Sequence, residues 1–189
     1  MNESEIKDKI LKAFGKSNRS NKIFLVVTPP EHYNLCKYTL LKYLLNEKNM
    51  KGIYVALNRA YSEILSASKG ELIKTDNLRF IDCSGERSKQ IPKSNVLFVE
   101  SPSALTEISI QITAQTNKEK IDFLFFDSLN TMSMYHNPVI IERFMHFLFN
   151  KLRQKEVAAS IMVIDEPGSK KILPMISQFA DIYIYILIE

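Results

Sequence analysis

Glycine is scarce in this chain of 189 residues. It occurs five times, which is under half of its average usage of about 7%. A phosphate-binding loop needs glycines where successive backbone N–H groups turn toward the phosphates. The scarcity limits any argument for a glycine-built nucleotide site. Whether a phosphate-binding loop is present depends more on the positions of the glycines than on their number.

Cysteine and long apolar segments are also rare. Cys36 and Cys83 are the only two cysteines, and they provide neither the framework of a small secreted domain nor a C-x-x-C pair. The chain does not start with a basic segment followed by an apolar one. Its longest apolar run, residues 182–188, has seven residues, whereas a membrane span needs about 20. We therefore expect a cytoplasmic protein without a signal peptide or a membrane-spanning segment.

No concentrated charge stands out. The 25 Lys and Arg residues exceed the 21 Asp and Glu residues by four, and this excess is spread along the chain, so nucleic-acid binding is allowed but not indicated. The length and the 46% hydrophobic content suit one domain with a real core. We divide the chain into an N-terminal helix with a basic connector, residues 1–22, and a main domain, residues 23–189.

The N-terminal segment has helical periodicity. Ile6, Ile10, Leu11 and Phe14 fall on one helical face, which predicts a short lead helix that stops at Gly15. The polar and basic residues 16–21 predict a surface connector. The lead helix with this connector is one candidate docking piece.

From residue 23 onward, short apolar runs alternate with longer amphipathic segments. The runs are mostly continuous, so both faces of the sheet should be covered by helices that cross over between parallel strands. This pattern predicts an α/β three-layer sandwich with a mostly parallel central sheet. The expected strands are residues 23–27, 53–57, 78–81, 96–99, 121–126, 160–164 and 182–188. The expected helices include 35–46, 103–117 and 138–154, with Ser101 and Pro102 as the N-cap and first residue of the second.

The order of these segments resembles the RecA-like ATPases, in particular their KaiC-like group. The resemblance covers about residues 21–188. Residues 23–30 (IFLVVTPP) resemble the strand that enters a Walker A loop, and residues 121–130 (IDFLFFDSLN) resemble a Walker B strand. Residues 53–65, 78–82 and 180–184 resemble the family's second strand and helix, its next strand and its closing strand. The resemblance implies a RecA/KaiC-like fold and side-by-side assembly with a second copy or another protein.

The phosphate loop departs from the pattern G-x-x-x-x-G-K-[ST]. Aligned on the end of the strand, Thr28 stands at the first glycine, Tyr33 at the second, Asn34 at the lysine and Leu35 at the hydroxyl. Pro29 and Pro30 restrict the backbone, Pro30 removes an N–H donor, and Glu31 adds negative charge where phosphates would lie. These residues predict a degenerate phosphate loop.

The catalytic positions are depleted as well. The resemblance places Asn58 where these enzymes have a glutamate, and an amide cannot act as a base. Asp127 keeps the acid on the magnesium side, with metal binding or capping of the next segment as its alternatives. Lys37 lies one helical turn beyond the aligned lysine and could bend back toward the helix N-terminus. With Asn58, Asp127 and Ser128 it makes up the possible residual ligand or anion contacts, while Arg59 is expected to be solvated.

These observations predict a non-catalytic pseudo-ATPase that acts as a regulatory or adaptor module through protein–protein assembly, with no catalytic residue and no cofactor. One alternative is a weak ATPase that binds ATP with magnesium through a rebuilt loop containing Lys37 and Asp127. A second alternative is a DNA-associated recombinase paralogue. The histidines and cysteines lack the spacing of a zinc site, and both cysteines are expected to be buried apolar residues.

Overall fold

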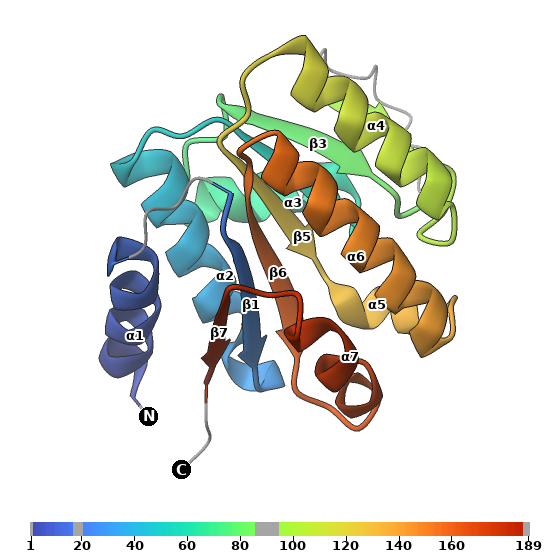
Figure 1. Cartoon of the computed structure of the whole chain (residues 1–189). Helices are drawn as coiled ribbons and strands as arrows, with labels where there is room; N and C mark the ends of the chain where they lie inside the picture. Colours follow the sequence, from blue (N-terminus) through green and yellow to red (C-terminus); the bar gives the residue numbers. More distant parts are fainter. Residues whose placement is uncertain (1, 17–20, 86–94, 187–189) are drawn as a thin grey trace.

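The computed structural model (Figure 1) describes residues 2–16, 21–85 and 95–186. Within these ranges, seven strands form one sheet in the order β4-β3-β2-β5-β6-β1-β7, and every neighbouring pair is parallel. The strands are β1 (Ile23–Thr28), β2 (Gly52–Ala56), β3 (Leu78–Asp82), β4 (Val96–Phe98), β5 (Phe123–Asp127), β6 (Ala158–Ile164) and β7 (Ile182–Tyr185). The expected parallel α/β sheet is confirmed.

Alternate residues of each strand point to opposite sides of this sheet, and helices cover both faces. One face packs against α4 (Leu105–Lys118), α5 (Leu129–Ser133), α6 (Pro138–Gln154) and α7 (Leu173–Ser177). The other face packs against α1 (Glu3–Lys16), α2 (Tyr33–Leu41), the π-helical η2 (Lys42–Glu47) and α3 (Tyr61–Gly70). Two short 3₁₀ turns, η1 (Pro30–His32) and η3 (Ser169–Lys171), complete the elements of the described ranges. The result is the expected three-layer sandwich.

Some expected helix boundaries are wrong. The first helix continues through Gly15 to Lys16, so that glycine does not end it. Ser101 and Pro102 do not start a helix, because α4 begins at Leu105 and the Ser101 hydroxyl instead accepts a hydrogen bond from the Ser103 amide at 3.1 Å. The centre of the expected connector, residues 17–20, and the end of the last expected strand, residues 187–188, lie outside the described residues.

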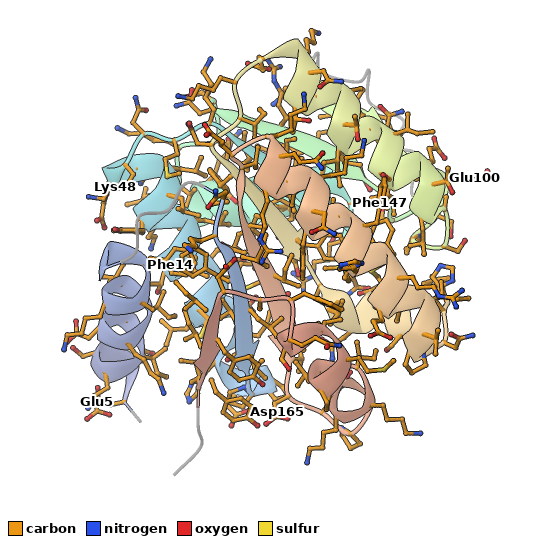
Figure 2. All side chains as sticks on the ribbon, in the orientation of Figure 1. Glu5, Phe14, Lys48, Glu100, Phe147 and Asp165 are labelled. Carbon is orange, nitrogen blue, oxygen red and sulfur yellow. The ribbon has the colours of Figure 1, made fainter. Side chains whose placement is uncertain are left out.

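The first helix packs against its own sheet. Ile6, Ile10 and Phe14 are buried. The ring of Phe14, which is labelled in Figure 2, stacks on that of Phe24 with the centroids 3.9 Å apart. The Lys9 ammonium also donates to the Tyr185 carbonyl at 2.7 Å, and a lysine at an edge strand discourages pairing with other strands. The apolar stripe of α1 is therefore already covered within this chain.

None of the helices in the described ranges combines the length and the apolar character that crossing a membrane requires.

Candidate functional site at the carboxyl edge of the sheet

A small cavity lies at the edge where β1, β2 and β5 end. Its volume is about 190 Å³. The residues that line it come from η1, α2, the loop after β2, α3 and the ends of β5 and β6: Pro30, Tyr33, Asn34, Lys37, Ala56, Asn58, Arg59, Ile64, Asp127, Ser128 and Ile164. The fold therefore brings three of the seven expected phosphate-loop residues, Pro30, Tyr33 and Asn34, together with all four of the expected residual contacts.

The other expected loop residues lie away from this cavity. Thr28 is fully buried, and the Cys36 thiol donates to its hydroxyl at 3.5 Å. Pro29 has an extended backbone and precedes η1. Glu31 is exposed, and Leu35 lines a separate groove between α1 and α2. The structure thus divides the aligned loop between the cavity, the core and the surface.

Asp127 is the centre of a polar cluster, and its peptide bond to Ser128 is cis. The Tyr33 hydroxyl donates to Oδ1 and the Tyr54 hydroxyl donates to Oδ2. The Lys37 ammonium lies 3.5 Å from Oδ2, and the Lys37 side chain is only 6% exposed. Both carboxylate oxygens therefore have hydrogen-bond donors, and an ammonium from the same chain balances the negative charge.

Tyrosine rings surround the Lys37 ammonium. It lies 5.4 Å from the Tyr33 ring centroid and 5.2 Å from that of Tyr38, distances at which a cation is attracted to an aromatic face. Lys37 lines the cavity, and its ammonium points at Asp127. Lys37 Nζ and Asp127 Oδ2 are 3.5 Å apart, and opposite charges attract each other more strongly in a poorly hydrated site than in water.

Asp127 does not cap the following helix, so that alternative is wrong. The N-cap of α5 is Ser128, which makes no side-chain capping bond, and the Asp127 carboxylate is held by the two tyrosines. Asn58 and Arg59 are both exposed at the rim of the cavity, as expected for a solvated arginine.

Sequence reasoning missed Tyr54, which lies inside a continuous apolar strand. In the β2–β5 register Ala56 is opposite Asp127, and Tyr54, two residues earlier, points to the same face of the sheet. Its ring is fully buried. A buried tyrosine hydroxyl usually finds a polar partner, so a tyrosine in an apolar run was the available signal.

The backbone around η1 offers few donors to a phosphate. Pro29 and Pro30 have no N–H group, the His32 amide donates to the Pro29 carbonyl at 3.1 Å, and the Tyr33 amide donates to the Pro30 carbonyl. With Lys37 and two tyrosines held on Asp127, the acid on the magnesium side is also engaged. These residues do not fit magnesium and a nucleotide phosphate.

The two tyrosines at Asp127 should titrate abnormally. Burial raises the pKa of Tyr33 and Tyr54 well above the ordinary value, and the negative charge of Asp127 raises both pKa values further. A raised native pKa means that the stabilisation is complete below the unfolded pKa of about 10 and is lost as the pH rises toward the native value.

We therefore expect the free energy of unfolding to fall above about pH 10, with each such tyrosine contributing up to about 1.4 kcal/mol per pH unit. Denaturant unfolding between pH 8 and pH 11 would measure this, with the pH values chosen to bracket the unfolded tyrosine pKa of about 10. Tyr54→Phe removes one of the two groups and should give a shallower decline. An unchanged slope in that variant would show that Tyr54 does not titrate as described.

Cysteines and histidines form no second site in the described part of the chain. Cys36 and Cys83 are both fully buried, as expected, and burial raises the pKa of both thiols. No group of three or more His, Cys, Asp or Glu residues there could hold a metal ion.

Comparison with protein-family models finds no match, and no curated protein sequence matches this chain. The all-parallel order of the described strands is compatible with a Rossmann-like or RecA-like fold.

Proposed function

We propose that this chain is a non-catalytic RecA/KaiC-like protein, a pseudo-ATPase, that acts as a regulatory or adaptor module by assembling with another protein. The observation that carries the proposal is the polar cluster at Asp127. Lys37, Tyr33 and Tyr54 together satisfy the carboxylate that an ATPase of this kind would turn toward magnesium.

The weak-ATPase alternative requires this cluster to open. Magnesium could reach Asp127 only if at least one tyrosine hydroxyl and the Lys37 ammonium moved away, which would leave buried polar groups without partners. Each buried polar group without a hydrogen bond costs about 1–3 kcal/mol, and a charged one costs more. Backbone hydrogen bonds to a phosphate would not offset this cost, because Pro29 and Pro30 at η1 have no N–H group.

Nucleotide titration tests the proposal directly. At about 2 mM ATP, a site with a dissociation constant of about 10 µM would stabilise the native chain by about 3 kcal/mol, since binding adds RT ln(1 + [L]/Kd). For a chain of 189 residues this corresponds to a rise in Tm of about 6–12 °C. We expect neither ATP nor ADP with magnesium to raise Tm by more than about 1 °C, and calorimetry to record no binding heat.

Two variants separate the alternatives. Lys37→Met removes the buried ammonium, whereas Lys42→Met removes a half-exposed lysine from the following turn, where it pairs with Glu71. If ATP binds at micromolar concentration and Lys37→Met alone abolishes binding, the rebuilt-loop ATPase replaces our proposal. Retention on immobilised duplex DNA that weakens steeply with salt would instead favour the recombinase paralogue.

A further inference from the structure

Exposed apolar side chains gather on one helical layer. In the described part of the chain, eight large hydrophobic residues are exposed, and six of them lie on α4, on α6 or between α5 and α6. We call these six the α4–α6 face: Ile110, Met134, Tyr135, Val139, Ile140 and Phe147. Figure 1 shows α4 and α6 side by side over the same side of the sheet, and Figure 2 labels Phe147 on α6. Single exposed hydrophobics are ordinary, but a concentration on one surface marks an interaction site.

The composition of this layer differs from that of a solvated helix. The charged residues of α4 and α6 that are exposed are Lys118 and Arg143, whereas Glu107 and Glu142 are half-buried. By contrast, the exposed side of α1 carries both signs, including Glu3, Glu5 and Lys7. A surface depleted in charge and enriched in aromatic residues and methionine has the composition of an interface core.

The exposed charges on α4 and α6 are positive, and the two acids of these helices, Glu107 and Glu142, are half-buried. Lys151 places its ammonium 5.5 Å from the Phe147 ring centroid, and Arg143 lies one turn before Phe147 on the same side of α6. None of the ion pairs between described residues involves Arg143 or Lys151. The face therefore presents apolar side chains next to cations that an acidic partner could pair with.

A groove continues the face at the start of α4. A cavity of about 560 Å³ is lined by Ser103, Ala104, Leu105, Thr106, Glu107, Ile110 and His136. Apart from Glu107, its lining carries no acid. The α6 helix has 17 residues and is therefore about 25 Å long. A partner helix of about the same length could lie along it.

We propose that the α4–α6 face binds an amphipathic helix of another protein, with an apolar stripe bordered by acidic residues. The inference rests on the proposed adaptor function and identifies its docking surface. A second copy of this chain fits less well, because it brings the same cations and the same formal net charge of +4 to the contact, and like charges at an interface weaken association.

Two synthetic helical peptides of about five turns test the proposal. Both carry leucines at helical spacing, and the remaining positions are mainly glutamate in one peptide and mainly lysine in the other. With the full chain, we expect the glutamate peptide to bind with a dissociation constant on the order of 10 µM in a fluorescence anisotropy titration. The lysine peptide should bind at least about tenfold more weakly, because its charges repel Arg143 and Lys151.

Matched variants locate the site. Ile140→Ser combined with Phe147→Ser should weaken binding of the glutamate peptide at least about tenfold, whereas Leu72→Ser, at an 82% exposed position elsewhere, should leave it unchanged. Equal affinity for the two peptides, or unaltered binding to the double variant, would overturn the proposal. A dimer in sedimentation that the double variant dissolves would also overturn it, in favour of a second copy. Nucleotide binding in the separate ATP titration would contradict the pseudo-ATPase function without changing the peptide result.

Discussion

Replacing Asp127 by alanine is expected to lower the free energy of unfolding by about 3–5 kcal/mol, the range measured when one partner of a buried charge pair is removed. The substitution leaves the ammonium of Lys37, whose side chain is 6% exposed, without its counter-ion. It also leaves the hydroxyls of Tyr33 and Tyr54 without their acceptor. Urea denaturation monitored by circular dichroism measures the loss.

A matched control lies at the same edge of the sheet. Asp165 also accepts a hydrogen bond from a tyrosine hydroxyl, that of Tyr185, but no described lysine or arginine forms an ion pair with it. Asp165→Ala should therefore cost only about 1 kcal/mol, the value of an ordinary hydrogen bond. If the two alanine variants lose similar stability, Asp127 is not the centre of a coupled cluster.

The coupling itself can be measured. In a double-mutant cycle, Lys37→Met/Asp127→Ala should lose less free energy of unfolding than the two single variants lose together. Once one member of the pair has been replaced, replacing the other leaves no buried charge without a partner. An interaction energy of about 1–3 kcal/mol is expected for groups in direct contact. Additive losses would mean that the 3.5 Å contact contributes little.

The general fold could be predicted because its signal is local. Continuous apolar runs between amphipathic segments indicate buried parallel strands with covering helices, and the run 138–154 matches α6 residue for residue. The predicted N-cap at Ser101 failed because a serine followed by proline also forms turns, and only the packing of α4 decides where the helix starts. The stop at Gly15 failed for a related reason, since Phe14 packs on Phe24 and holds the last turn.

The candidate site could be predicted only in part. Strand ends share one edge in a parallel sheet, so Asn58, Asp127 and Ser128 were expected near the start of α2. The direction of the Lys37 side chain was not predictable, because it depends on Asp127, which is 90 residues away in sequence. Tyr54 was hidden by its apolar neighbours. Side-chain pairing across the sheet is thus the information that a single sequence does not carry.

Gly52 is another position at which the constraint comes from a distant strand. It directly precedes the expected strand 53–57, and nothing local requires a glycine there. In the sheet it is opposite Phe123. A Cβ at position 52 would lie 2.2, 2.4 and 2.6 Å from three atoms of the Phe123 ring, far closer than van der Waals contact allows. The ring is 1% exposed and cannot swing into solvent.

Gly52→Ala is therefore expected to destabilise the chain by about 3 kcal/mol, the upper end of the range for overpacked cores. Phe123→Ala should cost about 3–5 kcal/mol through its cavity, but in that background Gly52→Ala should cost almost nothing, because the ring is gone. Gly70→Ala is the control, since no heavy atom lies within 4 Å of its added Cβ and alanine favours helix by about 1 kcal/mol. Thermal and urea unfolding of the four variants would measure the cycle. If Gly52→Ala destabilises the Phe123→Ala variant as much as it destabilises the original chain, the glycine is needed for its backbone conformation. If the destabilisation disappears in that variant, the glycine is needed to leave room for the Phe123 ring of β5 beside β2.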